Sequence, residues 1–411
     1  MITRRASPPV FSPQRPLRLR EYVLLIAALF SMVAFSIDSI LPALPEIGGL
    51  LVPDDVNKAQ LLISAFVIGA GAGQLIFGPL SDSMGRRFSL SMGMLLYMVA
   101  AVAAFWSQTL EAILFWRFVQ GLGAAGPRTC GMAMTRDLYE GRQMARVNSM
   151  AFGFFVFVPA VAPMIGQWIV LGFGWRHMFT AYILLAAVIL TWFLLRQPET
   201  LPPERRRPLS PRPTLAAFKV VLRTRVTLLY MAIITLAFGQ LMSFISSAQQ
   251  IFVDVLGAGT NFPYYFAMVT VFSAASGFLN AQLVMRLGMR RLALAGFATQ
   301  TILASLTLLA WWWFAPEGAF ALWLFCGWAT TLFFLNGLSF GNLNALAIQP
   351  LGHVAGTAAA VIGAVPTVAA IAIAAPVGLA FNHTPFPLLI GVSVCSALAW
   401  ALMQLDRGNM S

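Results

Sequence analysis

Long apolar stretches recur along almost the whole chain and are separated by short polar segments. Twelve of them are close to the roughly 20 residues that an α-helix needs to cross a bilayer, and they lie at about 22–41, 59–80, 88–106, 110–135, 145–170, 177–195, 226–248, 263–285, 291–314, 318–344, 354–380 and 385–404. Lipid offers no hydrogen-bond partner to an open strand edge, so helix is the default for a spanning segment. The weak alternation typical of a transmembrane barrel is absent. The pattern predicts an all-α membrane protein with twelve transmembrane helices.

A polar stretch divides the chain in the middle. Residues 196–225, rich in Pro and Arg, leave six spans on each side. Because proline interrupts helices, we expect a cytoplasmic linker there, with a six-helix bundle over 1–195 and another over 226–411. A short internal repeat supports this duplication, since "PLSDSMGRR" after the second span resembles "QLVMRLGMRR" after the eighth. Folds built from two such pseudo-repeats surround a central cavity and bind substrate near the middle of the bilayer.

Composition and charge agree with a membrane location. Hydrophobic residues make up 59% of the chain and charged residues only 10%, against about a quarter charged in soluble domains. If the N-terminus is cytoplasmic, 22 of the 26 Lys and Arg fall in cytoplasmic segments, from Arg4, Arg5 and Arg15 at the start to Arg407 at the end. This bias predicts that both termini lie on the cytoplasmic side of the membrane, which we expect to be a bacterial inner membrane. The basic residues alternate with apolar spans and form no single stripe, so we expect no nucleic-acid partner.

Several kinds of chemistry are excluded by the motifs. The three cysteines, Cys130, Cys326 and Cys395, sit singly within spans, which indicates neither a disulfide framework nor a metal site. "GLGAAG" (121–126) matches a dinucleotide fingerprint, but it lies inside a span and is better interpreted as a close-packing surface. No Walker loop and no nucleophile–base cluster can be assembled. We expect no enzymatic activity, no cofactor and no metal.

One carboxylate and one guanidinium occur at similar depths inside apolar spans. Asp38 lies sixteen residues beyond Tyr22 in the first span, about 24 Å along a helix. Arg117 is seven residues into the fourth span, roughly 10 Å from its outer end. Inserting each charge is unfavourable by roughly 2.5–3.5 kcal/mol, so such residues are usually functional. A neighbouring guanidinium lowers the pKa of a carboxylate and desolvation raises it. This balance suits a proton-coupling site. A static ion pair, or an Asp38 that reaches the outer headgroups, is the alternative.

Other polar and aromatic residues are candidates for a substrate pocket. Arg128 follows Arg117 by eleven residues, close to three whole turns, so both point from one face. Arg128 would favour an anionic or strongly polar substrate, unless it snorkels to the inner phosphates. Apolar pockets usually hold a few polar anchors, and the predicted set is Phe35, Asp38, Arg117, Arg128, Gln240, Ser243 and Asn336. Hydrogen bonding between helices would explain the last three equally well.

The segment "GPLSDSMGRRFSL" (78–90) resembles the signature between helices two and three of the major facilitator superfamily. The matching positions are Gly78, Leu80, Asp82, Gly85, Arg86 and Arg87. We expect Gly78 to permit close helix packing, Gly85 to permit a tight turn, and the charged residues to form ion pairs. Asp137 in "TRDLYEGR" is a natural partner. The resemblance implies that this loop braces helix two against later helices in the outward-open state.

Three further segments together resemble the bicyclomycin and chloramphenicol resistance branch of drug:proton antiporters. They are "DSILPALPEI" (38–47), "RFVQGLGAAG" (117–126) and "FVPAVAPMIGQ" (157–167). The resemblance implies that Asp38 and Arg117 serve proton coupling and substrate response. The usual antiporter signature of helix five ends in Gly-Pro-x-x-Gly-Gly. This chain keeps Pro163 and Gly166 but has Ala162 and Gln167, while Pro159 fits the narrower branch.

Three functions remain open. The first is a proton-coupled exporter of small amphipathic compounds, of the multidrug or amphenicol type, that works by alternating access. The second is a proton-driven uptake symporter for a small metabolite. The third is a membrane sensor or scaffold without transport, in which neutralising Asp38 and Arg117 would change no flux. The expected partners are protons, a small-molecule substrate and the lipid bilayer. Since one chain supplies both halves, we expect a monomer.

Overall fold

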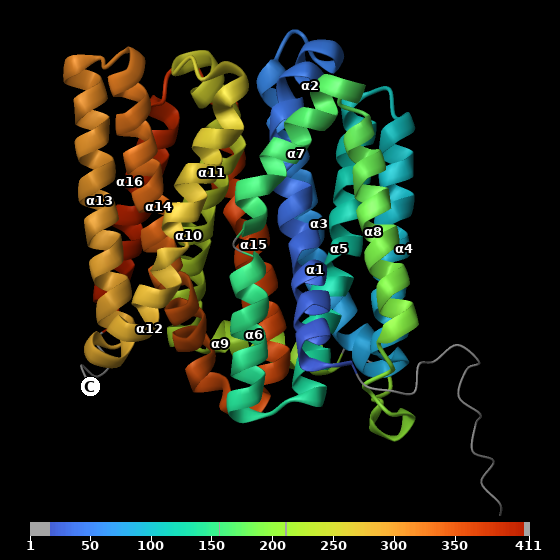
Figure 1. Cartoon of the computed structure of the whole chain (residues 1–411). Helices are drawn as coiled ribbons and strands as arrows, with labels where there is room; N and C mark the ends of the chain where they lie inside the picture. The colour runs from blue at the N-terminus through green and yellow to red at the C-terminus, as the bar shows by residue number, and fades with distance from the viewer. Residues whose placement is uncertain (1–16, 156, 210–211, 407–411) are drawn as a thin grey trace, which may run out of the picture.

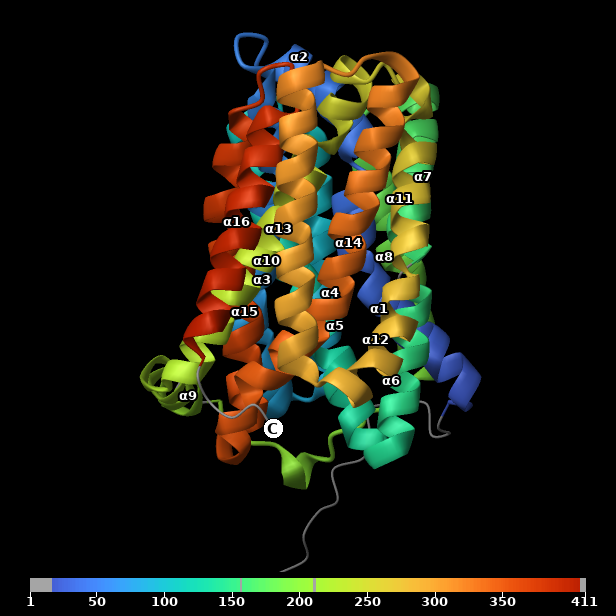
Figure 2. The same ribbon diagram turned by 90° about the vertical axis from the view of Figure 1, so that its left-hand side faces the viewer.

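The computed structural model describes residues 17–155, 157–209 and 212–406, and all regular structure in these ranges is helical. Arg4, Arg5, Arg15 and Arg407 lie outside the described residues. Long helices stand side by side in two groups, α1–α8 and α10–α16 (Figure 1). We call the upper end in both views, where α2 lies, the α2 end, and the lower end, where α9 lies, the α9 end (Figures 1 and 2; Figure 2 is turned by 90°).

The first group contains the helices before the linker. They are α1 (Leu19–Asp38), η1 (Leu41–Ala43), α2 (Leu44–Leu51), η2 (Val56–Gln60), α3 (Leu61–Met84), α4 (Arg86–Trp106), α5 (Leu110–Leu138), α6 (Gly141–Phe155), α7 (Phe157–Phe173) and α8 (His177–Arg196). The first span differs from its prediction because α1 ends at Asp38, after which the chain turns and continues helically to Leu51. Pro42 has no N–H for the carbonyl group of Asp38, so an α-helix is interrupted at this point.

The second group follows the linker. The linker itself holds η3 (Pro203–Arg205) and α9 (Arg212–Arg223). The elements of the second group are α10 (Arg225–Gln250), the π-helical turn η4 (Ile251–Val255), η5 (Gly259–Asn261), α11 (Phe262–Ser273), α12 (Ala275–Leu287), α13 (Met289–Phe314), α14 (Gly318–Ile348), η6 (Gln349–Val354), α15 (Ala355–Leu379) and α16 (Phe386–Leu405). Helix α9 was not expected inside the linker. Its buried Val221 packs into the apolar core of this group, and that contact is not visible in a proline-rich sequence.

Eleven helical segments among the described residues are long and apolar enough to cross a bilayer. Helix α5 is not among them, because Arg117 and Arg128 interrupt its apolar stretch. It nevertheless has 29 residues, about 43 Å at 1.5 Å per residue, and it packs against α3 and α4. Together with α5, the part of the chain that the structure describes holds the twelve spanning helices predicted from the sequence. The chain is a multi-pass membrane protein.

Glycines bring α3 and α5 into backbone contact. A Cβ atom on Gly121 would overlap the carbonyl oxygen of Phe66, and one on Gly69 would overlap that of Phe118. Small residues allow such approaches between membrane helices, where dispersion contacts replace the hydrophobic effect. The predicted close-packing role of "GLGAAG" is therefore confirmed.

The two groups share a local structure at matching positions. Gly85 before α4 has φ +99° and Gly288 before α13 has φ +80°, with ψ 158° and 155°. Only glycine adopts this region without strain, and the predicted tight turn at Gly85 is confirmed. This shared turn agrees with the pseudo-repeat read from the sequence.

The arginines after these turns also play matching parts. Arg87 donates hydrogen bonds to the carbonyl oxygens of Leu194 (3.1 Å) and Gln197, at the end of α8. Arg290 donates to the carbonyl oxygen of Asp406 (2.6 Å), directly after α16, and to that of Met403 (3.1 Å) in the last turn of α16. Basic side chains satisfy the unpaired carbonyl groups at a helix C-terminus. Each half therefore ties the start of one helix to the end of its last helix.

A single methyl group tests the close packing of α3 and α5. Gly121→Ala should lower the free energy of unfolding by about 1–3 kcal/mol, because the added methyl group overpacks the contact. The apparent melting temperature in detergent should fall accordingly. Gly327→Ala is the matched control, because nothing lies within 4 Å of a Cβ atom at this position in α14. It should be neutral or slightly stabilising. Equal melting temperatures for the two variants would contradict the packing described here.

Candidate functional site

Arg117 is fully buried inside the first group of helices. Its Nη2 donates to the carbonyl oxygen of Ser36 in α1 (2.9 Å), its Nε to that of Leu62 in α3 (3.4 Å), and its Nη1 to Oε1 of Gln120 (2.8 Å). The guanidinium also lies over the Phe66 ring, 4.5 Å from its centroid. Arginine stays charged in proteins, so these neutral acceptors and the ring share its charge. Arg117 thereby joins α5 to α1 and α3.

Two tyrosines complete this polar core. Ser36 Oγ lies 2.6 Å from the hydroxyl of Tyr97, and Ser39 Oγ lies 3.1 Å from that of Tyr182. The Tyr182 hydroxyl also donates to the carbonyl oxygen of Ser36 (3.4 Å). All four side chains are buried. The end of α1 is thus fixed from α4, α5 and α8.

Asp38 is the last residue of α1 and only 3% of its surface is exposed. None of the hydrogen bonds or ion pairs found among the described residues involves its carboxylate. The alternative of a static ion pair with Arg117 is not found among the described residues, because the guanidinium binds the Ser36 carbonyl oxygen two residues earlier instead. A buried carboxylate without a fixed partner is unusual, since burying an uncompensated charge is costly.

Helix α7 closes the same region on a further side. A Cβ atom on Gly166 would overlap the carbonyl oxygen of Ser39, so α7 approaches the end of α1 at backbone distance. Pro163 is buried inside α7, and Pro159 is half-buried one turn earlier. Gly166, one of the two residues kept from the antiporter signature, thus meets Ser39, the residue after Asp38. The part of these residues in transport remains a prediction.

Arg128 and Phe35 lie differently from Arg117. Arg128 is exposed, although its neighbours on α5, Pro127 and Cys130, are buried. It lies three helical turns beyond Arg117, on the face that Arg117 directs to α1. Phe35 is half-buried and makes an edge contact with Tyr182, with ring centroids 5.9 Å apart. Neither side chain is buried, so both stay predictions for a substrate site.

The predicted pocket residues of the second group are held within that group. Gln240 accepts a hydrogen bond from Ser396 Oγ of α16 (2.8 Å), so it faces a helix of its own half rather than α1 or α5. Ser243 donates to the carbonyl oxygen of Gly239 in its own helix (2.8 Å). Asn336 Nδ2 donates to its own helix, while its buried Oδ1 has no partner among the described residues. The structure favours the packing alternative for Gln240, and Ser243 and Asn336 stay predictions.

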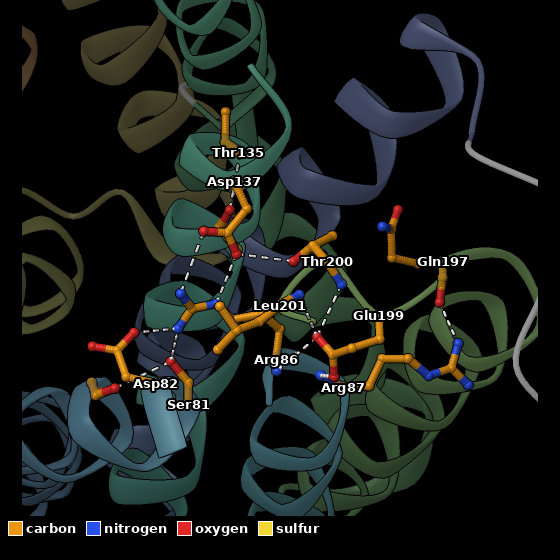
Figure 3. A network of polar contacts seen from close by, with 12 residues as sticks. Ser81, Asp82, Arg86, Arg87, Thr135, Asp137, Gln197, Glu199, Thr200 and Leu201 are labelled. Carbon is orange, nitrogen blue, oxygen red and sulfur yellow. Dashed lines mark hydrogen bonds and ion pairs between the residues drawn. The ribbon is translucent and has the colours of Figure 1, made fainter. Parts of the chain in front are cut away.

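A second polar network lies at the α9 end, around Arg86 (Figure 3). This side chain is buried, and it donates to Ser81 Oγ (2.7 Å), to Asp82 Oδ1 (2.6 Å) and to Asp137 Oδ2 (2.9 Å). The expected ion pairs of Asp82 and Asp137 with an arginine of the loop are therefore present. The arginine fork satisfies two carboxylates at once, which is its usual advantage over lysine.

Glu199 of the linker caps this network. Its carboxylate accepts from the backbone N–H groups of Arg86 (3.0 Å) and Arg87 (3.1 Å), the first two residues of α4. A negative side chain at a helix N-terminus satisfies unpaired N–H groups and the helix dipole. Thr200 Oγ1 adds a bond to Asp137 Oδ2 (3.0 Å). The start of the linker is therefore attached to the first group (Figure 3).

Gly78 does not have the expected packing role. A Cβ atom at this position in α3 would meet nothing within 4 Å, and the close glycine contacts of α3 lie instead at Gly69 and Gly73. The prediction failed because it took the motif glycine as the contact point. Contacts depend on which face of α3 meets α5, and Gly78 lies on another face.

Several functional-site residues were missed by sequence reasoning. Tyr97 and Tyr182 come from spans far from α1 in the sequence, so no local pattern pairs them with Ser36. Glu199 carried a usable signal, because it is one of two acidic residues in a linker with eight basic ones. An acceptor was needed for the first N–H groups of α4.

Removing the Glu199 cap should release the start of the linker. Glu199→Ala should raise the rate of tryptic cleavage at Arg205–Arg207 by roughly tenfold, as expected for a loss of about 1–2 kcal/mol at a charged cap. Glu204→Ala is the control, since Glu204 is exposed and makes no hydrogen bond among the described residues. Cleavage at the same rate in both variants would mean that Glu199 does not hold the linker.

Comparisons with known proteins agree with this arrangement. Residues 23–375 match the family model described as Major Facilitator Superfamily. The bicyclomycin resistance protein homolog of Haemophilus influenzae is 28% identical over 389 residues, which cover 92% of this chain and 94% of the relative. The chloramphenicol resistance protein of Pseudomonas aeruginosa is 35% identical over 162 residues, covering 39% of this chain and 38% of that protein.

Solved structures share the fold at lower identity. The xylose transporter XylE from E. coli, in a partially occluded inward open conformation, aligns with a TM-score of 0.74 and 16% identity. The alignment covers 95% of this chain and 100% of that one. Since the family model spans most of the chain, this protein is a membrane transporter of the major facilitator superfamily.

Proposed function

We propose that the protein exports small amphipathic compounds from a bacterial cell in exchange for protons. The observation that carries this proposal is Asp38, a carboxylate that is 3% exposed inside a membrane span and lacks a partner among the described residues. A charge in this position is compensated either by a bound proton or by a ligand. A group with these two states can couple the movement of one to that of the other.

The environment of Asp38 supports a mobile proton rather than a permanent ion pair. Arg117 lies nearby but donates to the Ser36 and Leu62 carbonyl oxygens and to Gln120. The guanidinium is therefore satisfied by other acceptors and makes no bond to the carboxylate among the described residues. A bidentate pair would lock Asp38 in the charged form, and coupling requires that it change.

The orientation that we propose places the α9 end in the cytoplasm. Basic residues concentrate there, in the linker and around Arg86, as the positive-inside rule requires for a cytoplasmic surface. The α2 end then faces the outside. Among the described residues, all hydrogen bonds between the two groups of helices lie at this outer end. This supports a conformation in which the path to the outside is closed.

The substrate class follows from the accessible side chains. Arg128 offers an exposed positive charge on α5, and Phe35 offers an aromatic surface near Asp38. A compound with an apolar body and a polar or anionic group would satisfy both. Relatives named for bicyclomycin and chloramphenicol resistance support a drug-like substrate.

Uptake is the second candidate function. Solved xylose transporters share the fold, and one of them is named as a proton symporter. The fold therefore serves both directions, and the sign of the coupled proton flux decides between them. A sensor without transport would show no coupled flux at all.

Asp38→Asn is the central test. Purified protein in liposomes with an imposed proton gradient and an internal pH dye would be given amphenicols, bicyclomycin-like compounds, cationic dyes and small peptides. The wild type should move protons when a substrate is added, in the direction opposite to the substrate. Asp38→Asn should lose this flux, because the amide cannot bind and release the proton.

Asp54→Asn is the matched control, because Asp54 is an exposed carboxylate of the same half. It should retain the flux. An Asp38→Asn variant that still builds a substrate gradient from a pH gradient would rule out Asp38 as the coupling site. Proton movement in the same direction as the substrate would establish uptake instead.

Arg128→Gln tests the polar end of the substrate. The apparent KM for substrates with an anionic or strongly polar group should rise roughly tenfold, as expected for one lost charge-assisted hydrogen bond. The apparent KM for purely cationic dyes should stay unchanged or fall. Arg142→Gln, at an exposed position near the start of α6, is the control and should leave the apparent KM unchanged for both kinds of compound. A uniform effect on all compounds would contradict a substrate-facing Arg128.

A further inference from the structure

Three amide side chains form a continuous hydrogen-bonded chain between the two halves at the α2 end. Gln60 Nε2 donates to Gln250 Oε1, and Gln250 Nε2 donates to Asn57 Oδ1 (2.8 Å). Asn57 Nδ2 in turn donates to the carbonyl oxygens of Phe381 (2.9 Å) and Leu379 (3.3 Å). Each of these contacts joins a residue of the first half to one of the second.

The three hydrogen-bonded amides connect segments that lie directly before or after a break in a helix. Asn57 and Gln60 belong to the short η2, just before α3. Gln250 is the last residue of α10, directly before the π-helical turn η4. Leu379 ends α15. Short π-helical turns often mark functional positions in helices, and breaks of this kind let helix ends move without unwinding the spans.

Local packing is adapted to this contact. Gln60 is 3% exposed and Gln250 9% exposed. A Cβ atom on Gly378 would overlap Oε1 of Gln60, so a glycine in α15 leaves the space that the glutamine fills. Elsewhere at this end, Gln167 Nε2 of α7 donates to the carbonyl oxygen of Thr260 (2.7 Å). The closed end is therefore held by neutral amides.

The hydrogen-bonding groups of these three amides are only partly satisfied. Gln60 Oε1 has no hydrogen-bond partner among the described residues, and a buried acceptor without a donor is unfavourable. When the halves separate, water can reach all these amide groups, and a protein hydrogen bond is largely replaced by one to water. Closure therefore gains little over opening, which is the condition for an equilibrium that a ligand or a proton can shift.

We propose that Asn57, Gln60 and Gln250 form the outer gate of the transporter. Their amide chain holds the α2 end closed, and it must break before Asp38 and the substrate site can exchange with the outside. This proposal rests on the alternating access and orientation of the proposed function, but not on its proton coupling. The three residues are gate residues and do not bind the substrate.

The distance across the gate can be measured directly. In a chain with Cys130, Cys326 and Cys395 replaced by Ala, spin labels at Asp54→Cys and Asn382→Cys would report the separation of the halves in lipid nanodiscs. Both positions are exposed at the α2 end. A short distance should dominate before any change in the gate. Gln250→Ala removes two links of the chain and should raise the ratio of long to short distances roughly tenfold.

Two further variants make the result decisive. Asn57→Asp keeps the size of a half-buried side chain but removes both donors to the Phe381 and Leu379 carbonyl oxygens, so it should produce the same shift. Gln249→Ala is the matched control, because Gln249 is a buried neighbour with no hydrogen bond across the halves among the described residues. It should leave the distances unchanged.

An unchanged distance distribution in both Gln250→Ala and Asn57→Asp would overturn the gate. So would an equal shift in Gln249→Ala, because the effect would then come from packing alone. The measurement needs no substrate, so the gate and the proposed function can fail separately. A shifted distribution without any substrate-dependent proton flux would keep the gate and remove the exporter. Coupled flux with unshifted distances would do the reverse.

Discussion

The positive charge of Arg117, placed where no water or lipid headgroup reaches it, is the constraint on which the first half depends. A guanidinium cannot shed its charge in a protein, so every donor must find an acceptor inside the bundle. Two backbone carbonyl groups, one amide and one aromatic face provide this. To supply them, α1 and α3 must both lie against α5. Glycines at the contact of α3 with α5 make that approach possible.

Using backbone carbonyl groups as acceptors leaves Asp38 free. An arginine paired with a carboxylate would form a stable and inert unit, whereas here the cation binds Ser36, two residues away. The first half thus keeps a fixed charge on α5 and a titratable carboxyl group at the end of α1. The helix break after Asp38 and the close approach of α7 at Gly166 set their relative position.

Features that depend on local order along the chain could be predicted from the sequence. The spans, the turn at Gly85 and the pairing of Arg86 with Asp82 and Asp137 all follow from composition or short motifs. Features that depend on which helix faces meet could not. Gln240 turns to α16, and the first-half tyrosines bind a serine from a distant span. Helix α9 was missed because its stability comes from a core contact of Val221 rather than from its own proline-rich surroundings.

The linker is attached at both of its ends, and this has a mechanical consequence. Glu199 and Thr200 fasten its start to the first half, and the backbone N–H of Arg207 donates to the Asp82 carbonyl oxygen (3.0 Å). Helix α9, from Arg212 onward, is anchored in the second half. Since an extended chain spans at most about 3.6 Å per residue, the short segment from Arg207 to Arg212 acts as a tether. It sets an upper limit on how far the inner ends of the two halves can swing apart, so the stroke of the transporter is limited by chain length as well as by contacts.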